Sequence, residues 1–410
     1  MNRIILHHAP WIASIAQPVS KDGAVAVKKG RIIDVGSFSN LQDKYPQAQT
    51  IFHPRCVLLP PLVNAHIHLE LSHIRLAEKY KPIDGFTGWI ENLLAAREEV
   101  GAIGELAEAA AQETLRQQTE QGVIAIGDIG NTDIGEKVSD MFAGILMHFH
   151  EVLGRSQKSR KSILAKISAA DNAKRFTAHA PYSTHPELIQ ALKKRACTLG
   201  HPFPIHTAEP PSENELLTSG SGELYKFLKQ RGFIDDSYDP PSGIDNLGSV
   251  QYLHSLGVLD KNTICVHSIH VHDEEVRLLA HTGSRVCLCP GSNRYLGVGT
   301  APVKKYLDHD ILPALGTDSR ASNPELSIWR EMRILSREQQ NILPDDILAM
   351  ATLGGAQALG IDKDFGTLSA GKKGRFLAVK VPEHIRSADD ILTFLVSDNF
   401  LVQPEWINEQ

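Results

Sequence analysis

Between about residues 58 and 360 the chain repeats one pattern, in which a short apolar run of strand length is followed by a loop and a helical stretch. The eight apolar runs cover residues 57–64, 122–128, 143–151, 176–180, 203–207, 263–268, 284–290 and 311–317. Helical periodicity between them is clearest over residues 104–121, 186–199 and 273–282. Eight strands separated by helices predict an α/β fold of the (β/α)₈, or TIM-barrel, type.

The two ends of the chain have a different pattern. Residues 1–57 and 361–410 contain short alternating strands, and the turn K-K-G-R occurs in both, at residues 28–31 and 372–375. Neither end is large enough for an independent core of good size. We therefore expect the two ends to pair with each other beside a barrel domain of residues 58–360.

Residues 210–257 form a long connection within the barrel region. The segment is rich in Pro, Ser and Gly and contains one helical piece at residues 223–230. Loops longer than about 15 residues in compact domains are commonly functional lids or disordered segments. We expect a lid over the barrel rim.

Composition excludes several classes of function. A formal net charge of −6 gives no reason to expect nucleic acid or an anionic membrane as a partner. No apolar run approaches the ~18 residues of a membrane span, and the N-terminus lacks a signal-peptide pattern, so a cytoplasmic protein is expected. The five cysteines lack C-x-x-C spacing, which argues against a zinc knuckle or disulfide framework.

Polar side chains stand where the predicted strands end. The ends carry His66 and His68 (first strand), His179 (fourth), His206 and Glu209 (fifth), His267 (sixth), Asn293 (seventh) and Asp318 (eighth). In such barrels the chemistry lies at the C-terminal ends of the strands. The H-x-H pair alone could be two ordinary histidines of a half-buried strand. Five strands that bring His, Glu or Asp to one rim predict a metal site with acid and base groups around it.

The donor types favour one divalent cation. His66, His68, His206 and Asp318 would supply three imidazoles and a carboxylate, and an open position would hold water with a lowered pKa. Asp318 or His267 could accept the water proton, and Glu209, three residues after His206, could carry a proton to the substrate. In the alternative interpretation Glu209 is a solvated loop acid and Asp318 caps a helix.

The motifs that carry these residues occur in the order seen in the amidohydrolase superfamily. They are N-A-H-I-H, H-A-P-Y-S, I-H-T-A-E, V-H-S-I-H-V, C-P-G-S-N and G-T-D-S-R-A-S-N. The chain most resembles the aminohydrolase branch, which holds guanine, S-adenosylhomocysteine and aminofutalosine deaminases and triazine hydrolases.

The resemblance implies a barrel with a small composite β-sandwich made by the two chain ends. It also implies a single Zn²⁺ or Fe²⁺ held by the four ligands above, with Glu209 and His267 as the acid/base pair and His179 as a substrate contact. No lysine closes the fourth strand, where binuclear relatives carry a bridging carbamylated lysine, and this supports one metal. Relatives are commonly dimers, so the resemblance allows a homodimer.

The chain departs from the branch at two places. Ser319 and Arg320 follow Asp318 where many relatives have Gly and a small residue, which puts substrate transfer by analogy in doubt. In G-K-K-G-R-F-L, Arg375 stands where relatives have the aspartate of G-K-x-A-D-L.

These observations predict a metal-dependent hydrolytic deaminase. The expected substrate is a purine nucleoside or related amino-substituted N-heterocycle, first of all of the aminofutalosine or adenosine type. The expected substrate contacts are His179, Trp89, Asn293 and Ser319, although Trp89 could equally pack in the core of an amphipathic helix. The alternatives are a triazine-type chloro- or aminohydrolase and a non-catalytic scaffold. The scaffold is disfavoured because every expected ligand is present.

Overall fold

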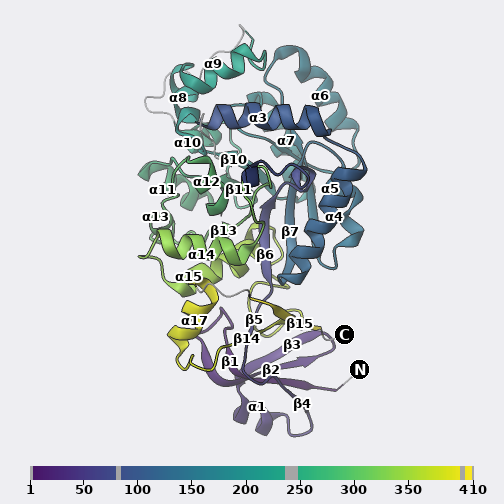
Figure 1. Cartoon of the computed structure of the whole chain (residues 1–410), viewed down its shortest axis with the longest axis vertical. Coiled ribbons are helices and arrows are strands. Elements are labelled where there is room, and N and C mark those ends of the chain that lie inside the picture. The colour runs from purple at the N-terminus through teal and green to yellow at the C-terminus, as the bar shows by residue number, and fades with distance from the viewer. Residues whose placement is uncertain (1–2, 80–84, 236–247, 398–401, 409–410) are drawn as a thin grey trace.

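The structure is a computed structural model in which residues 3–79, 85–235, 248–397 and 402–408 are described. A larger lobe contains parallel strands surrounded by helices, and a smaller lobe contains strands from both ends of the chain (Figure 1). None of the described helices is long and apolar enough to cross a membrane.

The larger lobe contains eight parallel strands in two sheets of four, ordered β6-β7-β8-β9 and β10-β11-β12-β13. They are β6 (Leu62–Ile67), β7 (Val123–Gly130), β8 (Ile145–Val152), β9 (Arg175–Ala178), β10 (Phe203–Thr207), β11 (Thr263–His267), β12 (Arg285–Leu288) and β13 (Ala314–Leu315). At one seam His206 N donates to His179 O at 2.9 Å, and at the other Thr317 N donates to His66 O at 2.9 Å. The strands follow one another around a barrel, as predicted, with an interrupted ladder at both seams.

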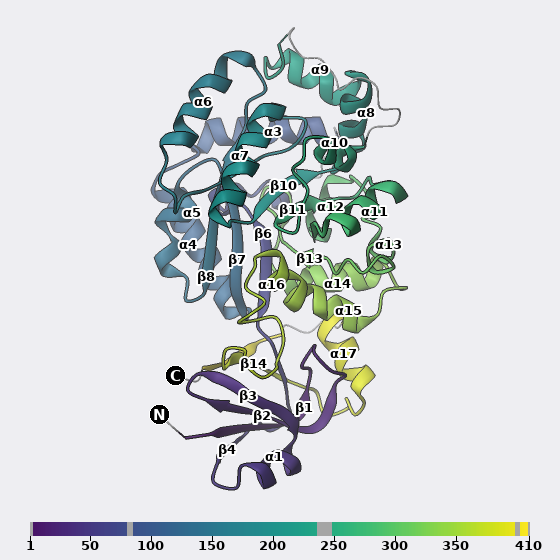
Figure 2. The same cartoon turned by 180° about the vertical axis from the view of Figure 1, so that it is seen from behind.

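The helices of the larger lobe pack around these strands (Figure 2). They are η1 (Leu69–Leu71), α2 (Leu76–Lys79), α3 (Gly85–Val100), α4 (Glu105–Glu120), α5 (Ile134–Lys137), η2 (Ser139–Met141), α6 (Gln157–Ala169), α7 (Pro186–Leu199), α8 (Pro211–Ser219), α9 (Gly222–Gln230), α10 (Ser249–Ser255), α11 (Asp273–Thr282), α12 (Pro290–Leu296), α13 (Val303–Leu307), α14 (Ile328–Glu338), α15 (Pro344–Ala349), the π-helical η3 (Met350–Gly354) and α16 (Gly355–Ala358). Helix α17 (Ala388–Ser397) packs against α14 and α15 where the two lobes meet (Figure 1). The sequence marks α7 clearly, because His185 caps its start, Pro186 occupies the first turn and Gly200 ends it at φ 68°.

The first and last predicted barrel strands differ from the observed ones. The predicted strand 57–64 is two strands, β5 (Cys56–Leu59) and β6, separated by Pro60 and Pro61. Proline has no N–H for a ladder, so the pair of prolines ends one sheet and the chain enters another. The predicted strand 311–317 keeps ladder geometry only at β13.

The smaller lobe holds one seven-stranded sheet of order β15-β14-β5-β1-β2-β3, with β4 also paired to β1. Its remaining elements are β1 (Ile5–Ile12), β2 (Ser20–Lys28), β3 (Arg31–Ser37), α1 (Phe38–Lys44), β4 (Gln49–Phe52), β14 (Arg375–Lys380) and β15 (Pro404–Asn408). Because β14 pairs antiparallel with β5, the C-terminal segment extends the N-terminal sheet. The expected pairing of the two chain ends is therefore present.

The segment 210–257 is more helical than expected. It contains α8, α9 and α10, while residues 236–247 lie outside the described part of the chain. Its Pro and Gly residues are helix boundaries: Pro211 occupies the first turn of α8 and Gly220 ends it at φ 60°. Turn-forming residues that suggested a loop thus mark short helices. Helices α8 and α9 lie beside α3 at the end of the lobe away from the smaller sheet (Figures 1 and 2).

Candidate active site

Three predicted metal ligands meet where β6 and β13 end. Nε2 of His66 lies 3.6 Å from Oδ1 of Asp318, and Nε2 of His68 lies 3.4 Å from the same oxygen. The other carboxylate oxygen, Oδ2, accepts hydrogen bonds from Ser292 Oγ at 2.5 Å and Ser322 Oγ at 2.7 Å. The two serines therefore orient the carboxylate so that Oδ1 faces the imidazoles.

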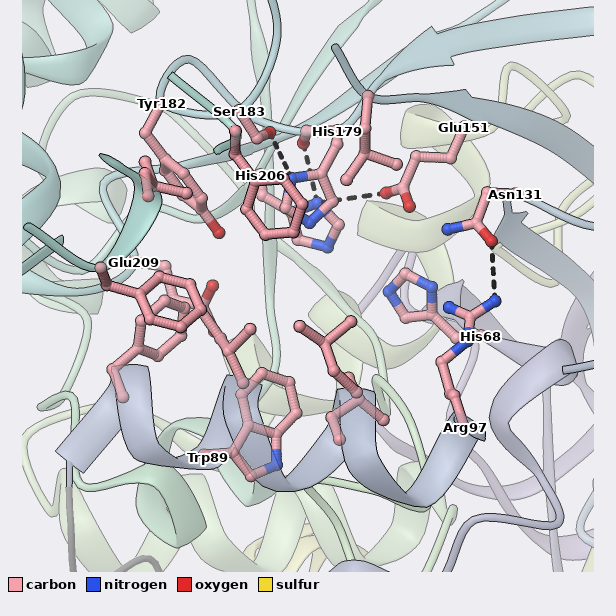
Figure 3. A pocket seen from close by; sticks show the side chains of 18 of the residues that line it. His68, Trp89, Arg97, Asn131, Glu151, His179, Tyr182, Ser183, His206 and Glu209 are labelled. Atoms are coloured by element: carbon pink, nitrogen blue, oxygen red, sulfur yellow. Dashed lines mark hydrogen bonds and ion pairs between the residues drawn. The ribbon is translucent and has the colours of Figure 1, made fainter. Parts of the chain in front are cut away.

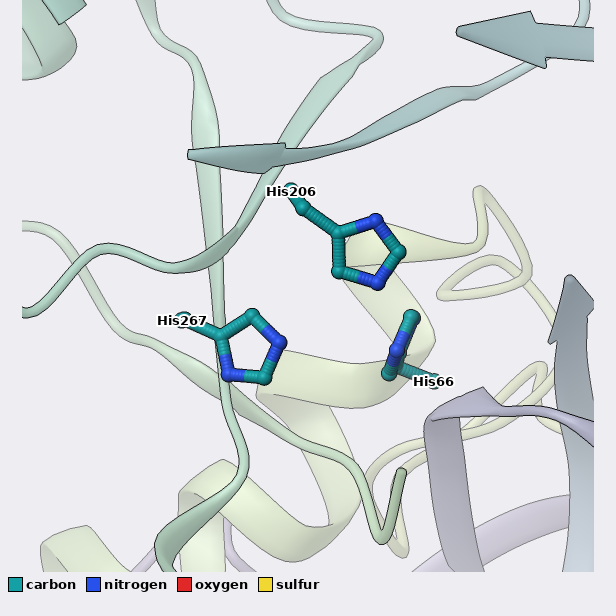
Figure 4. A group of neighbouring side chains, drawn as sticks. All are labelled: His66, His206 and His267. Atoms are coloured by element: carbon teal, nitrogen blue, oxygen red, sulfur yellow. The ribbon is translucent and has the colours of Figure 1, made fainter. Parts of the chain in front are cut away.

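His206, the fourth predicted ligand, completes the group from β10. Its ring stacks on that of His68, with centroids 5.4 Å apart, and lies 4.9 Å from the His66 ring. Its Nδ1 is 2.9 Å from the carbonyl oxygen of His179. Because a carbonyl can only accept, Nδ1 carries the hydrogen and Nε2 keeps a lone pair for a metal. Figure 4 shows His206 and His66 with His267 around one space.

These residues fit a divalent cation. The side chain of His66 is fully buried, and neither ring nitrogen has a hydrogen-bond partner among the described residues. Such an orphaned buried group costs free energy that a metal bond would recover. Three imidazoles and one carboxylate are a donor set for Zn²⁺ or a similar ion.

The protonation states also fit a cation. Burial, with the neighbouring His66 adding to it, lowers the pKa of His68 to about 3, and burial lowers the pKa of His206 well below its usual value. Burial alone would raise the pKa of Asp318, but the adjacent histidines hold it well below the usual range. Neutral imidazoles and an ionised carboxylate are the forms that ligate metals.

The predicted acid/base pair lies beside this group. Glu209 Oε1 is 3.5 Å from Nε2 of His267, and both side chains are buried. Burial, assisted by the charge of Asp318, raises the pKa of Glu209 well above that of an exposed carboxyl. Asn293 Oδ1 lies 2.9 Å from His267 Nδ1 and assigns the hydrogen to that nitrogen, which leaves Nε2 as a base facing Glu209.

A buried carboxylate holds the backbone that carries Glu209. Glu213, on α8, accepts hydrogen bonds from the backbone N–H of Ala208 and of Glu209, each at 3.1 Å. Ala208 has φ 52°, a left-handed conformation that is rare for residues other than glycine. The two hydrogen bonds compensate this strain and aim Glu209 at the metal-ligand group.

Left-handed backbone recurs at the other strand ends. His267 has φ 67°, Ser268 has φ 45° and Asp318 has φ 58°. Non-glycine residues in this region cost of order 1–3 kcal/mol each and cluster at functional sites. The surrounding fold therefore holds the backbone at these strand ends in a conformation that the residues would not adopt by themselves.

A cavity of about 450 Å³ opens in front of the metal-ligand group. One wall is apolar and comes from α3, α9 and the turn after α9, with Phe86, Trp89, Ile90, Leu93, Phe227 and Phe233. Polar groups face it, from Glu209 and Tyr182 at one end to Asn131 and Arg97 at the other (Figure 3). The cavity can therefore hold a flat apolar ring together with a polar substituent.

Of the four predicted substrate contacts, His179, Trp89 and Ser319 line the cavity. The His179 Nδ1 lies 2.5 Å from Ser183 Oγ. Trp89 lines the cavity and also packs against the hydrophobic core, and its Nε1 donates to Ala321 O at 3.0 Å. Its position is therefore compatible with both of the roles considered. Asn293 is not part of the cavity wall and instead contacts His267, as described above.

The polar end of the cavity contains residues that the sequence analysis did not select. Glu151 is buried at the end of β8, and its Oε1 has no hydrogen-bond partner among the described residues. Arg97, on α3, donates to Asn131 Oδ1 at 2.8 Å and lies 3.5 Å from Glu70 Oε1. The strand-end position of Glu151 was a usable signal, since it ends the third predicted strand. Arg97 gave none, because an arginine on an amphipathic helix is usually solvated.

The two residues after Asp318, where the chain departs from its relatives, lie in different environments. Ser319 faces the cavity, whereas Arg320 is not among the cavity-lining residues and forms an ion pair with Glu78. Only the serine is thus placed to contact a ligand.

An eight-stranded parallel barrel with three histidines, one aspartate and a buried acid/base pair at the strand ends defines a metal-dependent hydrolase class. Comparison with known proteins identifies the family. Residues 57–404 match the amidohydrolase family, so the chain belongs to it, as its motifs indicated. Residues 23–48 match the bacterial imidazolonepropionase-like composite domain, in the smaller lobe.

Individual relatives cover nearly the whole chain. An aminodeoxyfutalosine deaminase of Nitratiruptor sp. is 27% identical over 403 residues, which is 94% of each chain. A 5-methylthioadenosine/S-adenosylhomocysteine deaminase of Desulfitobacterium hafniense is 25% identical, and the match covers 93% of this chain and 89% of that deaminase. The structure of Helicobacter pylori aminofutalosine deaminase in complex with methylthio-coformycin has a TM-score of 0.80 at 23% identity and covers 96% of both chains. The structure of a triazine hydrolase variant has a TM-score of 0.75 at 18% identity, and the match covers 95% of this chain and 91% of the hydrolase chain.

Proposed function

We propose that this protein is a hydrolytic deaminase that releases ammonia from a purine nucleoside. The observation that carries the proposal is the buried carboxyl of Glu209, 3.5 Å from His267 and next to the metal-ligand group. Burial raises the pKa of this carboxyl and so favours its protonated form, and an amine leaving group requires a proton from such an acid.

We further propose one Zn²⁺ or Fe²⁺ per chain, held by His66, His68, His206 and Asp318. When bound, the cation supplies the positive charge that makes hydroxide available near neutral pH. The orphaned nitrogens of His66 and the serine-oriented carboxylate of Asp318 support this assignment.

The chain's own residues then have separate tasks. Glu209 gives its proton to a ring nitrogen of the heterocycle, takes a proton from water and passes it to the departing amino group. It recovers its own proton from the new hydroxyl group as that group becomes the carbonyl of the product. Asn293 fixes the hydrogen of His267 on Nδ1, so Nε2 is free to accept a hydrogen bond. The donor is the hydroxyl group that forms on the reacting carbon. His179 and Trp89 orient the ring, through a hydrogen bond and stacking respectively.

The dimensions and lining of the cavity support a nucleoside over a bare base. A volume of about 450 Å³ lies within the usual range for small-molecule sites. Its polar groups extend past the metal-ligand group to Arg97 and Asn131, which would meet a hydrophilic substituent on the ring (Figure 3). Relatives named as deaminases of aminodeoxyfutalosine and of methylthioadenosine support the same substrate class.

A substrate panel tests the proposal. Zn²⁺-reconstituted protein is assayed for ammonia release from adenosine, methylthioadenosine, S-adenosylhomocysteine, aminodeoxyfutalosine, adenine and guanine, and for chloride or amine release from triazines. We expect turnover of adenine nucleosides well above that of the free bases. Preferred turnover of a triazine would establish the alternative hydrolase, and turnover of no compound would favour the scaffold.

A further inference from the structure

The two K-K-G-R turns, called here the paired turns, lie side by side in the smaller lobe although they are far apart in sequence. They cover residues 28–31 and 372–375, and Gly374 N donates to Gly30 O at 2.8 Å. A Cβ atom on Gly374 would lie 2.6 Å from a methyl carbon of Val27 and 3.2 Å from the backbone carbonyl carbon of Gly30, so the close approach requires glycine. The two turns carry six cationic side chains, and the pairing places four of them around one cavity.

These side chains line a second cavity, of about 570 Å³. Lys29, Arg31, Lys373 and Arg375 face it, together with Asp364. Its floor comes from the N-terminal parts of β7 and β8, the ends of the barrel strands opposite the candidate active site. The cavity is therefore separate from the site described above.

The charges of this cavity are unbalanced. Arg31 Nη1 is paired with Asp364 Oδ1 at 2.9 Å. Among the described residues, no ion pair involves Lys29, Lys373 or Arg375. This concentration of positive charge stands out on a chain whose formal net charge is −6.

Arg375 is held in place without a carboxylate. Its Nη1 donates to Ala143 O at 2.5 Å, and its guanidinium lies 4.5 Å from the centre of the Trp406 ring. Its Nε is buried and has no hydrogen-bond partner in the described part of the chain. Arg375 also stands where the G-K-x-A-D-L pattern has an aspartate, so this position carries a positive charge and not a negative one.

We propose that this cavity binds a small anion that carries phosphoryl groups. The Arg375 guanidinium, held by Ala143 and Trp406, presents a positioned donor group that suits phosphoryl oxygens, and the exposed Lys29 and Lys373 supply further charge. The apolar floor of Ile124 and Ile145 leaves room for an organic group beside the anion. The proposal does not depend on the deaminase activity.

Calorimetric titration of the whole zinc-loaded protein with pyrophosphate and with ADP tests the proposal. We expect saturable binding to one site. The double variant K29E/K373E should weaken that binding by at least about tenfold, because it reverses two of the charges that face the anion. Tighter binding of ADP would assign the site to organic phosphates, and tighter binding of pyrophosphate would assign it to inorganic ones.

A matched control excludes general electrostatics. K194E/K261E alters two exposed lysines that do not line the cavity and changes the net charge by the same amount. Its affinity should stay within about twofold of wild type, since charges far from the anion are screened by salt. Zinc content is measured after each titration because these anions also bind zinc, and circular dichroism checks folding. If K29E/K373E does not fold, the single alanine variants of Lys29 and Lys373 replace it. No saturable binding by wild type, or equal weakening in both double variants, would overturn the proposal.

Discussion

Glu209 is buried beside His267 and lies three residues after His206, the proposed metal ligand, so the proposed function of Glu209 depends on the proton that it carries. We predict that Glu209→Gln keeps the metal but lowers kcat by roughly 10²–10⁴, the usual contribution of positioned acid/base catalysis. Metal analysis and ammonia release on one preparation measure both.

Glu215→Gln on the exposed face of α8 is the matched control and should behave like wild type. Near-normal ammonia release by Glu209→Gln would show that another group transfers the proton.

His179 tests substrate orientation. Its backbone carbonyl bonds His206, so truncating the side chain leaves that contact in place. We predict that His179→Ala retains the metal and loses ~1.5–3 kcal/mol of transition-state stabilisation, the range for a hydrogen bond to a charged or polarised group. The measurements are kcat/KM, metal content and Tm. Loss of metal would place His179 among the ligands, and a lowered Tm with normal kcat/KM would mark it as structural.

At the scale of elements, α8 positions the end of β10 through one carboxylate. Glu213→Ala removes the acceptor for the N–H groups of Ala208 and Glu209. Leaving a buried donor unpaired costs about 1–3 kcal/mol, so the free energy of unfolding should fall by at least that amount. We also expect kcat to fall with little change in metal content, because Glu209 is aimed by this backbone.

Glu213→Gln keeps one acceptor oxygen and should recover part of both losses. Urea unfolding and kcat measure the two effects. A Glu213→Ala variant that is destabilised but fully active would show that Glu213 stabilises the fold without positioning Glu209.

The strands β7 and β8 are joined by a buried ion pair that also supports the His68 turn. His148 Nδ1 lies 2.6 Å from Asp128 Oδ2, and Asp128 Oδ1 accepts from Leu69 N at 2.8 Å. Burial lowers the pKa of His148, but the hydrogen bond and charge of Asp128 outweigh burial and raise the pKa above its usual value.

A histidine whose pKa is higher in the folded state adds stability below its unfolded pKa of about 6.5, and this contribution is lost as pH rises through the folded value. We therefore predict that wild type exceeds His148→Asn in free energy of unfolding by more at about pH 6 than at about pH 8. Urea unfolding at both pH values measures the difference. An equal difference at both would contradict the assignment.

For the molecule as a whole, the proposed metal would link strands from both sheets of the barrel. His66 comes from β6, His206 from β10, and Asp318 follows β13, so a bound cation joins the two barrel seams. We predict that chelation lowers Tm and that Zn²⁺ restores it. A ligand at 1,000 times its Kd adds about 4 kcal/mol to the free energy of unfolding.

His66→Ala should remove most of this response, because it deletes one ligand from the site. Differential scanning calorimetry with and without chelator measures it. A response as large in His66→Ala as in wild type would place the stabilising metal elsewhere.

The succession of strands and helices, and the residue types at the strand ends, could be predicted from the sequence alone. Apolar runs predict buried strands whichever neighbours the strands pair with. A histidine at the C-terminal end of such a strand lies at the barrel rim, because all parallel strands end there. For this reason the positions of His66, His68, His206, Glu209, His267 and Asp318 follow from the pattern, and the structure brings all six together.

The sequence could not predict which side chains from distant elements share an environment, because folding brings those elements together. Arg97 on α3 meets Asn131 after β7, and the paired turns join residues from opposite ends of the chain. Asn293 turns toward His267 and not toward the cavity for the same reason, since its neighbours come from another strand. Local preferences specify a strand or a helix, but burial and hydrogen bonding between elements far apart in sequence decide what each side chain contacts.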